Sequence, residues 1–192
     1  MRKWRRVDTA DGPRFVSALE QHEVALLRTM ATSVREMLDG RQSASPSDPL
    51  EQITGIRTGN STAPEDATVR RLLPDFVRDR SGAADDPAAS NEALRSLHEP
   101  QIIDAKIAAA QRLVDTLPDG GGRLELTAED AGVWIAAVND IRLALGTILQ
   151  VGPDMPDRLP PGHPMAAHLE VYHWLTVLQE YLVLGLMGKP IR

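Results

Sequence analysis

Hydrophobic residues recur every three to four positions in four segments of the chain, which is the spacing that places them on one face of an α-helix. The first segment has a single apolar stripe, formed by Val24, Leu27, Ala31, Val34 and Leu38. Before this stripe, Ser17 and Glu20 have the spacing of a capping box, and after it Gly40 is a favourable helix end. The pattern predicts a first long helix on the surface of a helical bundle.

Two further segments in the second half of the chain have the same spacing. In residues 91–117 the stripe consists of Ile103, Ile107, Ala110, Val114 and Leu117. We expect Pro100 to break or kink this helix, because proline has no N–H to donate. In the next segment the stripe consists of Trp134, Val138, Ile141, Leu145 and Ile148. Thr127 and Asp130 are spaced to cap the start of this third long helix.

The last helical segment, residues 164–187, is apolar on most sides and leaves only a thin polar seam near Glu170, His173 and Glu180. A helix of this kind is either central to a bundle or shared with another subunit. We expect both, namely a core helix whose exposed flank forms a homodimer. The interface residues that we predict are Trp174, Tyr181 and Leu184.

Residues 3–19 predict a small β-hairpin, in which two short runs flank Asp11 and Gly12, a dipeptide that favours a tight turn. An isolated hairpin is only marginally stable, so we expect it to dock on the helices. The alternating residues 123–126 are a candidate for a strand added to its edge. Short helices are expected over residues 49–56 and 62–73.

The predicted fold is therefore mainly α, with one domain over residues 1–192. It combines the hairpin at 3–19 with a bundle of about four long helices plus short helices over 20–190. Segments rich in Pro, Gly, Ser or Asp favour loops. Mobile loops are predicted near residues 41–60, 79–90 and 150–163.

The composition narrows the classes of protein. The formal net charge of −6 gives no domain-wide basic footprint, so any contact with DNA has to come from a local patch. The absence of cysteine excludes a disulfide, a thiol nucleophile and a thiolate zinc site in this chain. No signal peptide is predicted, and apolar stretches such as 133–138 are too short to span a bilayer. We expect a cytoplasmic protein without membrane contact.

Local basic patches are the candidates for contact with nucleic acid or a protein partner. Arg2, Lys3, Arg5 and Arg6 surround Trp4 and predict such a contact edge on the hairpin. Arg70 and Arg71 form a second candidate patch on a short helix. The alternative interpretation is a solvated face that nearby acidic residues balance.

Asn139, Asp140 and Arg142 interrupt an otherwise apolar helix. Burying such groups is costly unless they are paired. They predict either a ligand pocket or, as the favoured interpretation, a structural polar network. In the network, Arg142 would pair with a carboxylate such as Asp104 or Glu170.

No catalytic residue, metal site or cofactor is predicted, so an enzyme is not expected. His163, His168 and His173 are spaced five residues apart, and five residues turn an α-helix by about 500°, so neighbouring histidines point in different directions. Gly120, Gly121 and Gly122 are not followed by the residues of a nucleotide-binding loop. No hydrolase motif is present.

Six segments resemble one family in register over nearly the whole chain: residues 1–7, 11–15, 48–56, 70–76, 138–146 and 172–175. This is the actinobacterial family of unknown-function domains labelled DUF2017. The family includes a described oxidative-stress transcription regulator. The resemblance implies a non-enzymatic regulator that works with an alternative sigma factor and RNA polymerase. It also implies that the regulator promotes the expression of cysteine-biosynthesis genes and senses oxidant through its own cysteines.

The present sequence departs from this pattern because it has no cysteine. Either regulation is not redox-gated in this chain, or a partner senses the oxidant.

The sequence leaves three hypotheses about function. The first is a dimeric transcription regulator of the oxidative-stress response that contacts a sigma factor or RNA polymerase, with promoter DNA as a further candidate partner. The second is a helical scaffold or adaptor without a DNA role. The third is a small-ligand sensor that uses Asn139, Asp140 and Arg142.

Overall fold

The computed structural model describes residues 4–45, 57–77, 86–156, 158–160 and 162–189. Within them the chain is mainly α-helical and has one small antiparallel sheet, as predicted. The elements in chain order are β1 (Arg5–Thr9), β2 (Gly12–Leu19), α1 (Gln21–Ser43), α3 (Ala67–Leu72), α4 (Pro87–Thr116), β3 (Gly122–Thr127), α5 (Ala128–Ile148) and α6 (Ala166–Leu186).

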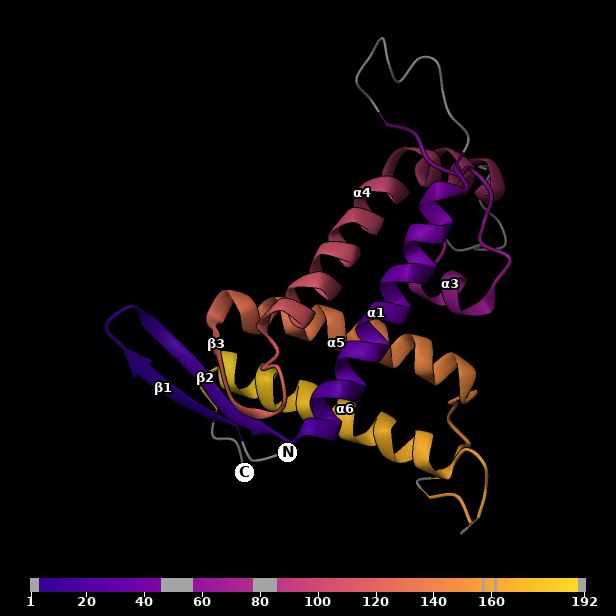
Figure 1. The fold of residues 1–192 in the computed structure, drawn as a ribbon. Coiled ribbons are helices and arrows are strands. Elements are labelled where there is room, and N and C mark those ends of the chain that lie inside the picture. Colours follow the sequence, from indigo (N-terminus) through magenta and orange to yellow (C-terminus); the bar gives the residue numbers. More distant parts are fainter. Residues whose placement is uncertain (1–3, 46–56, 78–85, 157, 161, 190–192) are drawn as a thin grey trace.

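The four long helices form two pairs that cross each other (Figure 1). Helix α1 packs along α4, and α5 packs along α6. Helix α5 is central, because it contacts α1, α3, α4, α6 and the strands β2 and β3. This arrangement differs from the single bundle that the periodicity predicts. Periodicity shows which face of a helix is apolar, but it does not show which other helix covers that face.

The last helix, α6, lies outside α5 and is not the central helix that its apolar composition predicts. Its buried residues are Leu169 in the first turn and, further along, Leu175, Leu178, Leu182 and Gly185, which share one face. Three large apolar residues of α6 are exposed, Val177, Val183 and Leu186, and so is Met187 just after the helix. Their exposed fractions are 37% to 58%. The last helix therefore buries one face along most of its length and leaves several apolar side chains exposed at other positions.

The sheet has the order β1-β2-β3, and both pairings are antiparallel. The hairpin turn lies at Ala10 and Asp11, and Gly12 follows with a φ of +101°, a value that favours glycine. The strand predicted over residues 123–126 is confirmed as β3. Its Leu126 is paired with Phe15 of β2, and both side chains are buried in the core.

Two of the long helices begin with capping boxes, but one begins later than predicted. Ser17 lies in β2, and the N-cap of α1 is Glu20, which forms its capping box with Glu23. The hairpin needs the residues before Glu20 to pair with β3, so strand pairing decides where the helix begins. Thr127 and Asp130 cap α5, as predicted.

Gly40 does not end α1, although it is a favourable stop. The helix continues to Ser43. A glycine inside a helix costs about 1 kcal/mol relative to alanine. The last turn of α1 has a compensating tertiary contact, because Arg41 Nε donates to Glu99 Oε1 of α4 at 2.7 Å.

Helix α4 continues through Pro100 and is 30 residues long. Figure 1 shows that its first part runs in a different direction from the rest, as expected for a helix kinked by an internal proline. The helix begins at Pro87 after the N-cap Asp86, so residues 87–90 are helical where a mobile loop was predicted. Proline is favourable in the first turn of a helix because its missing N–H has no partner there in any case.

The short helix predicted over residues 62–73 is α3, which is limited to Ala67–Leu72. It begins after Asp66, whose side chain accepts hydrogen bonds from the backbone N–H groups of Thr68 and Val69. The short helix predicted over residues 49–56 lies outside the described residues. The mobility predicted for the loops stays a prediction.

Helix α5 is long and apolar enough, by length and composition alone, to cross a membrane. The uninterrupted apolar runs in the sequence are short, so they did not predict a helix of this length and apolar composition. In this structure α5 is the central helix of the core, and its Trp134 and Val138 are fully buried against neighbouring elements.

Candidate functional site

The predicted contact surface on the hairpin corresponds to the edge strand β1. It pairs with β2 on one side, and the other side has no strand partner among the described residues, so it presents free backbone hydrogen-bonding groups. All five residues of β1 are exposed. Figure 1 shows the turn end of the hairpin projecting beyond the helices.

Trp4 was predicted as part of this surface, and that prediction is wrong. Its side chain is 2% exposed and packs edge-to-face on Trp134 of α5, with ring centroids 6.2 Å apart. A tryptophan side chain has a large apolar area, and removing that area from water favours the core over the surface. Trp4 therefore anchors the start of β1 to the central helix.

The basic residues of β1 are Arg5 and Arg6, and both are exposed. Arg6 Nε donates to Asp8 Oδ1 at 3.1 Å, and the Asp8 side chain is 78% exposed, so this ion pair is weak. Arg2 and Lys3, the other predicted members of the patch, lie outside the described residues. Within the described part, the contact edge is a short exposed strand with two arginines.

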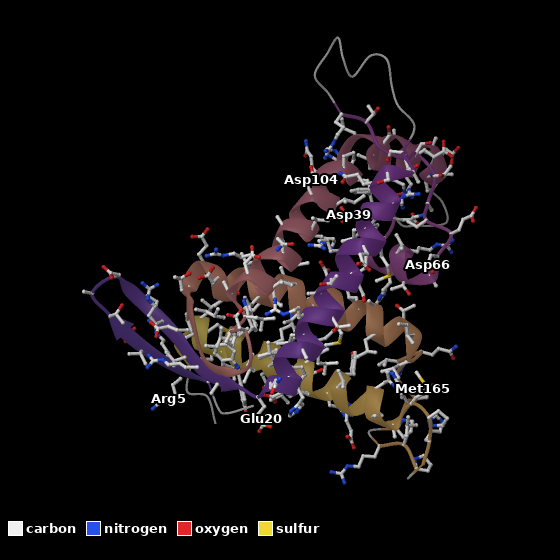
Figure 2. All side chains as sticks on the ribbon, viewed as in Figure 1. Arg5, Glu20, Asp39, Asp66, Asp104 and Met165 are labelled. Atoms are coloured by element: carbon white, nitrogen blue, oxygen red, sulfur yellow. The ribbon has the colours of Figure 1, made fainter. Side chains whose placement is uncertain are left out.

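Arg70 and Arg71, the second predicted patch, are exposed on α3. Figure 1 places α3 on the other side of the molecule from β1, so the two basic patches do not form one surface. Figure 2 shows the same separation between Arg5 of β1 and Asp66 at the start of α3. Arg70 Nε donates to the carbonyl of Pro64 at 2.8 Å, whereas Arg71 borders a surface hollow together with Arg142.

Asp140 and Arg142 do not form one polar network, because they point to different helices. Asp140 is 4% exposed and accepts a hydrogen bond from Lys106 Nζ of α4 at 2.6 Å. Burial raises the pKa of Asp140 above its ordinary value, while the Lys106 ammonium opposes this shift. The pair joins α4 to the central helix.

Arg142 points to α6, where both of its hydrogen-bond partners are neutral. Its Nε donates to Thr176 Oγ1 at 3.1 Å, and a terminal N–H donates to Gln179 Oε1. The carboxylates expected to pair with Arg142 do not do so: Asp104 (Figure 2) accepts from Gln42 Nε2 at 2.8 Å and pairs with Arg57. Arg142 is half-buried, and the helical periodicity of the sequence did not predict which helix it faces.

The residues predicted for a dimer interface are only half-exposed within one subunit. Trp174 and Tyr181 pack against the core of their own chain, and Leu184 is also half-buried. The homodimer stays a prediction. The more exposed apolar residues of this helix are Val177, Val183 and Leu186.

A buried ion network joins α1, the segment after α3, and α4, and sequence reasoning missed it. Glu99 is 2% exposed and accepts from Arg41 Nε and from Arg95 Nη1, both at 2.7 Å. Arg95 is 1% exposed and also pairs with Asp75 Oδ1 at 2.7 Å. The spacing of Arg95 and Glu99 by four residues on a helix was the available signal. Ion pairs with this spacing are usually on the surface of a helix. The Arg95–Glu99 pair is buried because other elements pack over it, which the spacing does not predict.

The described residues contain no group of three or more His, Asp and Glu side chains that could hold a metal ion. His163 Nδ1 accepts from the backbone N–H of Met165 at 3.1 Å, so it serves the turn before α6. His168 and His173 are exposed on α6.

The described structure defines a mainly α-helical protein whose exposed features are a basic edge strand, an apolar helix face and a cationic hollow. A family model described as "Domain of unknown function (DUF2017)" matches residues 1–186, and the chain belongs to this family. The resemblance seen in the sequence is thereby confirmed.

Relatives with regulatory names cover nearly the whole chain. Proteins named "Oxidative stress regulator AosR" from Mycobacterium tuberculosis and Mycobacterium bovis are each 62% identical over 195 residues, covering 98% of this chain and 89% of the relative. A relative from Mycobacterium leprae is 58% identical over 194 residues. No solved structure matches the chain.

Proposed function

We propose that this protein is a regulator of the oxidative-stress response that acts by contact with a sigma factor or RNA polymerase. The observation that carries the proposal is the 62% identity, over 98% of the chain, to proteins named oxidative stress regulators. Such identity over nearly the whole chain favours a shared role as well as a shared fold. In this proposal the protein works in the cytoplasm, where RNA polymerase is found.

The edge strand β1 is the proposed contact surface. A partner segment in extended conformation can add to an exposed sheet edge, because main-chain hydrogen bonds supply affinity and flanking side chains supply specificity. Arg5 and Arg6 are exposed beside that edge. Their charge favours an acidic partner segment. Because the chain has no cysteine, thiol-based sensing of oxidant would be a task of the partner.

The test is binding of the purified protein to core RNA polymerase, to holoenzymes with different sigma factors, and to promoter DNA alone. We expect binding to a sigma factor or polymerase, and a loss of at least tenfold in affinity for the double variant Arg5→Glu, Arg6→Glu. The matched control is Arg123→Glu, which changes an exposed arginine on the opposite edge strand β3. Equal binding by both variants would refute the contact surface, and binding to none of the polymerase components would refute the proposal.

A second candidate function is a scaffold or adaptor without a DNA role. The exposed apolar residues at Val177, Val183, Leu186 and Met187 favour it, because such groups are usually buried or used for binding. Capture of partners from cell extract, followed by identification, separates the two functions. Polymerase components favour the regulator, and their absence together with a reproducible other partner favours the adaptor.

A further inference from the structure

A surface hollow lies where α3, the C-terminal end of α5 and the start of α6 meet. Its volume is about 500 Å³, which is within the range of small-molecule sites. Arg71 of α3, Arg142 of α5 and Tyr172 of α6 border it, together with Thr147 and Val151. Two cationic side chains from different helices thus meet at one concave surface.

Among the described residues, no carboxylate that lines this hollow balances its positive charge. None of the described residues that line it is Asp or Glu. Arg142 donates only to Thr176 and Gln179 and lies over the Tyr172 ring, with 5.3 Å from its guanidinium carbon to the ring centroid. Arg71 has no hydrogen bond or ion pair with any described residue. By contrast, the buried Arg95 pairs with two carboxylates.

The guanidinium of Arg142 is also held in a fixed orientation. Its two neutral acceptors are themselves oriented, because Thr176 Oγ1 donates to the carbonyl of Tyr172 at 2.9 Å and Gln179 Nε2 donates to the carbonyl of Ile135 at 3.1 Å. These contacts fix the direction of the guanidinium without neutralising it. A site in which the charged group is already oriented loses less entropy when a ligand binds.

Gly146 shapes the wall of the hollow. A Cβ atom at this position would lie 3.3 Å from Cε2 of Tyr172, which is closer than ordinary contact. Without a side chain at Gly146, the Tyr172 ring can lie against α5 and beside Arg142. The ring then presents an apolar surface next to the two guanidinium groups.

We propose that the Arg71–Arg142 hollow binds a small-molecule carboxylate or phosphate. Guanidinium groups bind both anions through charge-assisted, often bidentate hydrogen bonds. The volume exceeds that of a bare phosphate and accommodates an organic body beside Tyr172 and Val151. A nucleic-acid backbone is the weaker candidate, because it is usually bound by a stripe of several cationic residues, and two are present here. This site is independent of the proposed contact at β1.

The test uses citrate, adenosine monophosphate and inorganic phosphate as probes, each at the same ionic strength, with sodium chloride as the reference. Calorimetric titration gives the affinity, and thermal unfolding gives the stabilisation. At a tenfold excess over its Kd, a bound probe is expected to raise Tm by about 3 °C. Binding by citrate, by the nucleotide or by phosphate alone distinguishes organic carboxylate, organic phosphate and free phosphate as the source.

Three single substitutions locate the binding. We expect Arg142→Gln and Arg71→Gln each to weaken binding about tenfold or more, because each removes one charge-assisted contact. The matched control is Arg158→Gln, which removes the same charge from an exposed position that does not line this hollow. Arg71 is exposed and makes no hydrogen bond or ion pair with the described residues, so its variant remains informative even if Arg142→Gln fails to fold.

The proposal is overturned if no probe binds above the chloride reference. It is also overturned if Arg71→Gln binds the probe as tightly as the unchanged protein does. In the unchanged protein, shifts of the Nε–Hε NMR signals of Arg71 and Arg142 during titration support the site, and shifts confined to other arginines refute it.

Discussion

Glu99 lies between two arginines at a place where the fold has removed nearly all water. It is 2% exposed, and Arg95 beside it is 1% exposed. Taking charges out of water is costly, and the cost is offset only when both charges are paired with good geometry. The bonds at 2.7 Å from Arg41 and from Arg95 meet this condition. At the residue scale, then, the structure depends on complete pairing of buried charges.

We predict that Glu99→Gln lowers the free energy of unfolding by about 3 kcal/mol, because Arg41 and Arg95 lose their shared buried carboxylate. Urea unfolding followed by circular dichroism measures this value. The control is Glu125→Gln, which removes an exposed carboxylate that pairs with Arg123. That change should cost less than about 1 kcal/mol. Equal effects of the two substitutions would contradict the prediction.

At the element scale, α6 and β1 each leave one side without a partner in the described structure. Helix α6 exposes the apolar side chains of Val177, Val183 and Leu186, and β1 exposes a sheet edge. Elements of this kind are common at protein interfaces. The two surfaces differ in chemistry, because one is apolar and the other is basic. They are therefore suited to different partners.

We predict that α6 forms a homodimer through its apolar side, and that the variant Val177→Glu, Val183→Glu is a monomer. A charge at each position would have to be buried without a partner in the interface. Analytical ultracentrifugation measures the mass, which is 21.0 kDa for one chain. Ile148→Glu, at a 60% exposed position of α5, is the control. A mass of one chain for the unchanged protein would contradict the prediction.

At the scale of the whole molecule, the sheet and the crossed helix pairs share one core. Trp4 comes from the residue before β1, Trp134 from α5, and Phe15 from β2, and all three are buried in the same cluster. Buried aromatic side chains contribute strongly to stability because of their area. The hairpin thus keeps its position through contact with the central helix, and the position of its exposed edge depends on that contact.

We predict that Trp4→Ala lowers the free energy of unfolding by about 3–5 kcal/mol, because it leaves a large cavity against Trp134. Amide hydrogen exchange should also become faster in β1 and β2 than in α4. The control is Val7→Ala at an exposed position of β1, where the cost should be within about 0.5 kcal/mol. Unchanged exchange in the hairpin of Trp4→Ala would contradict the anchoring role.

Much of the local structure could be predicted because it depends on neighbours in the chain. The capping pair Thr127 and Asp130 and the strand at 123–126 were found from spacing alone, and both are confirmed. Ser17 was assigned wrongly to a helix cap because pairing of β2 with β3 competes for that residue. The candidate site was harder to predict, since Trp4 and Arg142 each show their role only through a partner far away in the sequence.

The features that could be predicted along the chain are the mainly α class, the hairpin and its third strand, the lack of thiol chemistry in this chain, and the family. These follow from periodicity, turn residues, composition and similarity, all of which can be read along the chain. Other features could be seen only in the folded chain: α5 is central, Trp4 is buried, Glu99 joins two arginines, and Arg71 and Arg142 border one hollow. Such contacts depend on the free energy of packing whole elements together, and no local pattern carries that information.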